Sequence, residues 1–198
     1  MADLVLSPGP AQAGAPRVPG NKGIWAGITC EFIEFLVLFI VYFVARSHFP
    51  EEFRQGSTHL SPWAGTVITL VMISSSLCIA ASVASIRAGR RRVSFYWLLA
   101  GLVVALGYPL AKYMEFRWNM AHGIHGDSGI FFTVYYYLTI NHLVHAFWGI
   151  LGIGWVLVRH HFGAYSAEDY SGLEALACYW HATDIIWLTI FPFFYVLA

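Results

Sequence analysis

The 198-residue sequence carries too few charges to build a water-facing surface. Hydrophobic residues make up 58% of it and charged residues only 11%, against about 25% charged in an ordinary soluble domain. The formal net charge is zero, so no long-range field favours nucleic acid or an acidic substrate. Composition therefore excludes an ordinary soluble protein and favours one that lies in a membrane.

Five apolar stretches are long enough to cross a bilayer, which takes about 20 residues of helix. Their approximate limits are 24–45, 63–86, 95–116, 130–158 and 173–197. Runs this long and uniformly apolar do not suit barrel strands. The sequence therefore predicts an all-α bundle of five transmembrane helices over residues 24–198, without a second domain. Residues 1–23 are rich in Pro, Ala and Gly, and a disordered N-terminal tail is predicted there.

The Lys and Arg residues of the short connections predict how the bundle is oriented. The tail, the second connection and the fourth connection share one side and hold seven of them: Arg17, Lys22, Arg87, Arg90, Arg91, Arg92 and Arg159. The opposite side holds three: Arg46, Arg54 and Arg117. The N-terminus is therefore expected to be cytoplasmic and the C-terminus periplasmic.

Small residues and prolines mark special places in the predicted helices. Small residues let helices approach closely where lipid supplies no hydrophobic drive, and two predicted contact faces are rich in them: Ser76, Ala80 and Ala84, and Gly149, Gly152 and Gly154. Pro109 is expected to kink the third helix, and Pro192 to loosen the end of the fifth.

Ionisable residues recur inside the apolar stretches, where each costs about 2.5–3.5 kcal/mol on insertion scales. They form pairs three residues apart, so each pair shares one face of its helix. Four such faces must turn away from lipid, toward each other or toward a partner protein. The sequence therefore predicts a buried polar network of Glu31 and Glu34, Lys112 and Glu115, His142 and His145, and His181 and Asp184.

The residue types leave three interpretations of this network open. It could be structural, with Lys112 bound to Glu115 and His181 to Asp184. It could be a di-metal carboxylate centre, although no helix carries the Glu-x-x-His run that such centres use. It could also be a proton or ion route, although the paired broken helices and the two-fold repeat of transporters are missing.

At these same residues the sequence resembles subunit III of the cytochrome c and quinol oxidases. The run Y-W-H-A-T-D-I-I-W at 179–187 looks like the family's Y-W-H-x-x-D-x-x-W signature, which here comprises Tyr179, Trp180, His181, Asp184 and Trp187. N-H-L-V-H at 141–145 is similar to G-x-H-x-x-H-V, with Asn for Gly. C-E-F-I-E-F at 30–35 aligns with S-E-x-x-F-F, and Y-M-E-F at 113–116 with a helix ending in E-Y or E-F.

The resemblance implies an accessory role in a respiratory haem-copper oxidase. In that family the third subunit holds no redox centre, docks on the catalytic subunit, binds phospholipid in a cleft and protects the catalytic core. The chain is therefore expected to have no catalytic residue, metal or cofactor of its own. Its expected partners are subunit I, other oxidase subunits and lipid. Its expected location is the bacterial inner membrane, which it would cross several times. The resemblance also makes Glu31 the buried acid that carbodiimides modify.

Two residues depart from the usual pattern of the family: Glu34 is an additional acid, and Lys112 is unusual in its helix. The run P-E-E-F at 50–53 and the short five-helix form are similar to a branch found beside nitric oxide reductase. An accessory protein of nitric oxide reductase therefore remains the alternative to an oxidase subunit.

Overall fold

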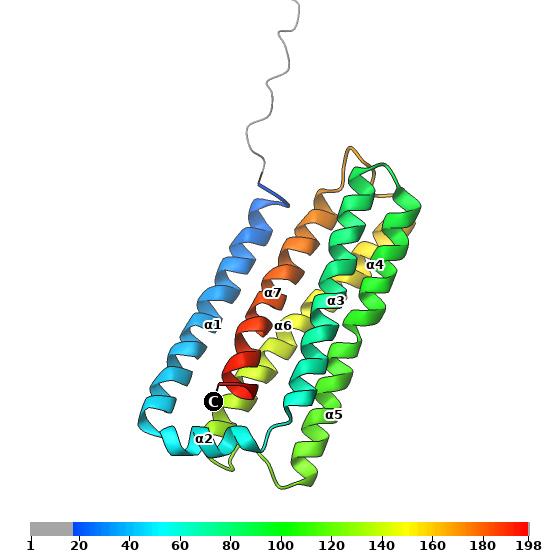
Figure 1. Cartoon of the computed structure of the whole chain (residues 1–198). Coiled ribbons are helices and arrows are strands. Elements are labelled where there is room, and N and C mark those ends of the chain that lie inside the picture. The colour runs from blue at the N-terminus through cyan, green and yellow to red at the C-terminus, as the bar shows by residue number, and fades with distance from the viewer. Residues whose placement is uncertain (1–17, 198) are drawn as a thin grey trace, which may run out of the picture.

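The computed structural model describes residues 18–197, and this range folds into seven helices without a strand. In Figure 1 the long helices run side by side and the short α2 lies across one end of the bundle. This confirms the predicted all-α fold. The helices are α1 (Lys22–His48), α2 (Pro50–Thr58), α3 (Pro62–Arg87), α4 (Arg91–Ala105), α5 (Gly107–Ala121), α6 (Ile130–His161) and α7 (Ser171–Tyr195).

Four helical segments of the described range are long and apolar enough to cross a membrane: Lys22–His48, Pro62–Arg87, Arg91–Ala121 and Ile130–His161. They coincide with the first four predicted stretches. The fifth stretch forms α7, which runs the length of the bundle (Figure 1) but is not among these four. The chain is thus a multi-pass membrane protein in which α7, packed against α1, α3 and α6, is the most enclosed long helix.

The third predicted span is broken into α4 and α5. α4 ends at Ala105 and α5 begins at Gly107. Pro109 explains the break, because its ring clashes with the carbonyl of Ala105 four residues earlier and its nitrogen has no hydrogen to donate. The interruption lies at Leu106, three residues before the proline at which a kink was predicted. Pro192 acts similarly at the end of α7, which stops at Tyr195.

The helix α2 was not predicted, although its start carries recognisable signals. Pro50 occupies the first turn, where a missing N–H does no harm. The Oε2 atom of Glu52 accepts a hydrogen bond from the backbone nitrogen of Ile130 (3.0 Å), so α2 caps the start of α6. Phe53 is buried against Tyr42 of α1, with ring centres 5.3 Å apart. Because α2 has only nine residues, it is too short to be recognised as a membrane-spanning stretch.

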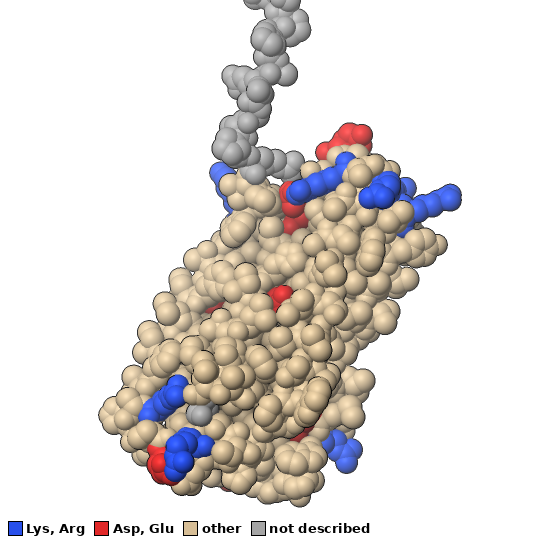
Figure 2. All heavy atoms as spheres, viewed as in Figure 1, with Lys and Arg blue, Asp and Glu red and all other residues tan. Residues whose placement is uncertain are grey.

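Charged side chains gather at the two ends of the molecule, and Figure 2 shows an almost uncharged band between them. The turns between α3 and α4 and between α6 and α7 share one end, with the start of α1 (Figure 1). Arg17 and most of the predicted tail lie outside the described residues. Near its start the described chain is attached to this end, because Gly20 N donates to Glu174 Oε2 (3.1 Å). Glu174 also pairs with Arg87.

The glycines of α6 confirm one predicted contact face in part. A Cβ at Gly149 would lie 2.7 Å from the Trp180 ring of α7, and one at Gly152 would lie 3.2 Å from Leu176. A Cβ at Gly154 would meet nothing within 4 Å. The prediction is therefore right for Gly149 and Gly152 and wrong for Gly154, which lies on another side of the helix.

The predicted contact face of α3 is wrong beyond its first residue. Ser76 is buried, whereas Ala80 and Ala84 are exposed. α3 packs against α4 through a neighbouring face, on which the Ser75 hydroxyl donates to the backbone oxygen of Gly101 (3.0 Å). The spacing of small residues identified a stripe along the helix. It did not show which face of the helix contacts the next one.

We predict that Gly149→Ala destabilises the bundle, because the new methyl group would overlap the Trp180 ring. Overpacking of this kind costs about 1–3 kcal/mol. Gly154→Ala is the matched control and should leave stability unchanged, or raise it slightly through helix propensity. Thermal unfolding in detergent compares the two variants, and equal losses of stability would contradict the assigned α6–α7 contact.

Candidate functional site

An imidazole of α6 lies between two carboxylates of α1. Glu31 is almost fully buried, and its Oε1 atom accepts a hydrogen bond from the Thr183 hydroxyl of α7 (3.0 Å). His145 Nδ1 lies 3.6 Å from the same oxygen, and His145 Nε2 lies 3.2 Å from Glu34 Oε2. Within residues 18–197 the second carboxylate oxygen of Glu31 has no hydrogen-bond partner. This cluster joins α1, α6 and α7.

His142 binds two helices at once, and its partners fix its tautomer. Its Nε2 atom lies 3.0 Å from the backbone oxygen of Thr183, and its Nδ1 atom lies 2.7 Å from the Tyr108 hydroxyl. A carbonyl oxygen can only accept, so Nε2 carries the hydrogen and donates it to Thr183. In the neutral ring, Nδ1 then accepts a hydrogen bond from Tyr108. The imidazole therefore connects α5, α6 and α7.

The ion pair of Lys112 and Glu115 is enclosed completely. Lys112 Nζ lies 2.8 Å from Glu115 Oε2 and 3.3 Å from each of the hydroxyls of Tyr135 and Tyr195. Tyr195 donates to the other oxygen of Glu115 (2.6 Å). Nζ also lies 4.8 Å from the centre of the Phe116 ring, which favours the cation. The predicted pair is confirmed, and two tyrosines extend it to α6 and α7.

His181 and Asp184 meet through a serine of α3. Nδ1 of His181 lies 3.3 Å from the Ser76 hydroxyl, and Ser76 also hydrogen-bonds Asp184. The two side chains of the predicted pair also interact electrostatically with each other. Through Ser76 the pair fastens α7 to α3.

The other residues of the α7 motif also bind neighbouring helices. The Tyr179 hydroxyl donates to the backbone oxygen of His145 (3.1 Å). Trp180 is fully buried against α6. Trp187 Nε1 donates to the Thr69 hydroxyl of α3 (2.9 Å). All five residues of the motif therefore attach one face or another of α7 to the bundle.

The predicted polar residues thus form three clusters instead of one continuous network. The first cluster centres on His145, Thr183 and His142, the second on Lys112, and the third on Ser76. Their geometry suits the holding together of helices. Within the described residues no group of three or more His, Cys, Asp or Glu side chains could hold a metal ion.

Sequence reasoning missed the hydroxyl groups that complete these clusters: Ser76, Tyr108, Tyr135, Thr183 and Tyr195. Tyrosine is enriched at the edges of bilayers, so its presence in a span does not predict a buried hydroxyl. One signal could have found one of the five. Tyr108 lies four residues before Lys112, so it shares a helix face with a buried charge.

The fold and these clusters define a class: a multi-pass helical membrane protein whose buried polar side chains fasten its helices together. No family model matches the chain. It is 30% identical over 177 residues to cytochrome c oxidase subunit 3 of Synechocystis sp., which covers 88% of this chain and 74% of the relative. It therefore belongs to the cytochrome c oxidase subunit 3 family, as its motifs predicted.

Two further relatives agree with this membership. The chain is 29% identical over 182 residues to cytochrome c oxidase subunit 3 of Thermostichus vulcanus, covering 89% of this chain and 86% of the relative. It is 22% identical over 188 residues to a protein of Aeropyrum pernix named heme-copper oxidase subunit I+III, covering 92% of this chain and 23% of that protein.

We predict that Lys112→Met lowers stability by about 3–5 kcal/mol, because Glu115 would be left as a buried and unpaired charge. The double variant Lys112→Met, Glu115→Leu removes both charges and should recover most of the loss, since Tyr135 and Tyr195 still bind each other (3.1 Å). Thermal unfolding of the two variants in detergent measures the difference. A double variant no more stable than the single one would contradict the assignment.

Proposed function

We propose that this chain acts as the non-redox third subunit of a haem-copper oxidase in the bacterial inner membrane, where it docks on the catalytic subunit and stabilises it. Its membership of the subunit 3 family supports this role. The name of the Aeropyrum pernix relative joins subunits I and III in one protein, which supports subunit I as the direct partner.

A half-exposed carboxylate on an apolar helix face carries the docking proposal. The Glu34 side chain is 43% exposed. It lies in an exposed stripe of α1 with Cys30, Val37 and Val41, at spacings of three and four residues. A charged group facing hydrocarbon is costly. A partner helix over this stripe would remove Glu34 from lipid, so the α1–α6 face around Glu34 is the proposed docking surface.

The proposed orientation has five crossings. α7 would cross with the four apolar segments, because they surround it and spare its polar residues contact with lipid. Lys22 and the cluster Arg87–Arg92 would then lie on the cytoplasmic side, with the C-terminus in the periplasm. The Arg46 and Arg54 side chains belong to the opposite, less basic end.

A groove between α1, α6 and α7 supports the binding of phospholipid. Its volume is about 460 Å³, and its lining includes Trp148, Trp155, Gly152, Arg159 and Tyr165. A guanidinium beside apolar and aromatic surface suits a phospholipid, whose phosphate and acyl chains have the same arrangement of charge.

A passive role is favoured over the other interpretations of the buried residues. The Lys112–Glu115 pair and His142 have their polar atoms bound by neighbouring helices. Groups held in this way resist the rearrangement that a proton route or a metal site would require. The named relatives favour an oxidase over nitric oxide reductase as the complex that this chain joins.

We predict that Glu34→Ala reduces the amount of catalytic subunit that co-purifies with the tagged chain. The turnover of each complex that remains intact should be unchanged, because Glu34 belongs to the docking surface. The measurement is subunit content by quantitative mass spectrometry, together with initial oxygen consumption per haem.

Glu168→Ala is the control for this experiment. Glu168 lies in the exposed loop before α7, where a hydrogen bond with Ser166 lowers the pKa of its carboxyl, so this substitution also removes one negative charge. Full subunit content with reduced initial turnover in Glu34→Ala would contradict a docking role. Recovery of a nitric oxide reductase catalytic subunit would contradict the oxidase assignment.

A further inference from the structure

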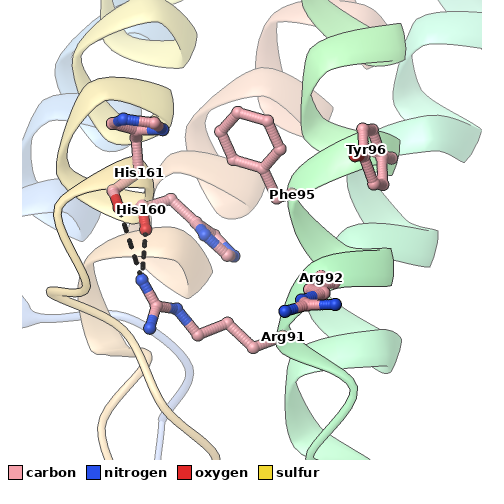
Figure 3. A pocket seen from close by; sticks show the side chains of 6 residues that line it. All are labelled: Arg91, Arg92, Phe95, Tyr96, His160 and His161. Carbon is pink, nitrogen blue, oxygen red and sulfur yellow. Dashed lines mark hydrogen bonds between the residues drawn. The ribbon is translucent and has the colours of Figure 1, made fainter.

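A hollow of about 440 Å³ lies between α4 and α6 at the basic end of the bundle, apart from the polar clusters described above. Figure 3 shows the side chains around it. Two cations, two imidazoles and two aromatic rings make up its lining, and none of its residues is acidic: Arg91, Arg92, Phe95, Tyr96, His160 and His161.

Arg91 is held in a fixed position across the hollow. Its Nη2 atom donates to the backbone oxygens of His160 (3.1 Å) and His161 (3.4 Å), as Figure 3 shows. These carbonyls end α6, and a cation there opposes the negative end of the helix dipole. Gly163 makes room for this contact. It has a φ of +88°, and a Cβ there would lie 3.2 Å from Arg91 Nη2. The role of Arg91 is therefore partly structural.

Arg92 is the cation that remains free to bind something else. Within residues 18–197 it makes no hydrogen bond or ion pair. Arg87, at the same end, is already paired with Glu174. An unpaired guanidinium beside a hollow without acids is suited to a phosphate, which accepts hydrogen bonds from it in a forked geometry.

An apolar stripe continues from Arg92 down the exposed face of α4. Tyr96, Leu99 and Val103 follow Arg92 at spacings of four, three and four residues, so they share one face of the helix. Their exposed fractions are 67%, 38% and 63%. A cation at the edge of the membrane above an apolar stripe matches a lipid, with a charged head group and acyl chains below it.

We propose that the hollow between α4 and α6 binds the phosphate of an anionic phospholipid, with Arg92 as its principal cation. Arg91 lines the other side of the hollow, and Tyr96, Leu99 and Val103 contact an acyl chain. Basic pockets between transmembrane helices are suited to such head groups. This site is separate from the groove between α1, α6 and α7, and its occupation does not depend on which complex the chain joins.

The test measures lipid binding to the full chain in detergent by native mass spectrometry. The probes are phosphatidylglycerol, phosphatidylcholine with the same acyl chains, and inorganic phosphate. Arg92→Gln should weaken the binding of phosphatidylglycerol about fivefold, the effect of one cation near a membrane surface. Arg92→Lys should retain most of the affinity, because the charge remains.

Arg90→Gln is the matched control, since Arg90 belongs to the same basic cluster but does not line the hollow. It should affect phosphatidylglycerol far less than Arg92→Gln does. Equal effects of the two variants would overturn the site in favour of diffuse surface charge. Equal loss of phosphatidylcholine binding in Arg92→Gln would overturn the preference for an anionic lipid. Inorganic phosphate could also bind with the same affinity as the lipid and in a way that depends on Arg92. That result would overturn the lipid as ligand in favour of a free anion.

Discussion

Hydrogen bonds between α7 and its neighbours are the constraint on which the rest of the bundle depends. Thr183 shows how close together these bonds lie, because its hydroxyl binds Glu31 of α1 and its backbone oxygen binds His142 of α6. α3 reaches α7 through Ser76, and α5 reaches it through the cluster of Lys112 and Glu115. Four helices thus direct polar side chains to a fifth.

This arrangement explains how the most enclosed long helix can carry buried polar residues. Lipid supplies no hydrophobic drive that brings helices together, so packing and interhelical hydrogen bonds must do so. α7 can carry His181 and Asp184 because other helices enclose it. α1 shows the opposite pattern. Much of its surface is apolar and exposed, and Glu34 is the exception that marks a place for a partner.

Much of the fold could be predicted from the sequence, since the length of each apolar stretch alone defines a helix. The face of each polar pair and the contact of Lys112 with Glu115 also followed from spacing. Spacing could not identify partners on other helices, because it does not fix how one helix is rotated against the next. The bond from Tyr108 to His142, the exposure of Ala80 and the lack of a close neighbour at Gly154 therefore emerged only from the structure.

The central claim is that buried polar groups bind the helices together, with His142 in a defined tautomer between Tyr108 and Thr183. The ¹⁵N chemical shifts of His142 at neutral pH, assigned by comparison with His142→Gln, test it most directly. The account predicts a neutral imidazole that carries its hydrogen on Nε2 and accepts at Nδ1. A neutral ring with its hydrogen on Nδ1 would contradict the bond to the Thr183 carbonyl, and a doubly protonated ring would contradict the bond that Nδ1 accepts from Tyr108. Either result would contradict the passive role.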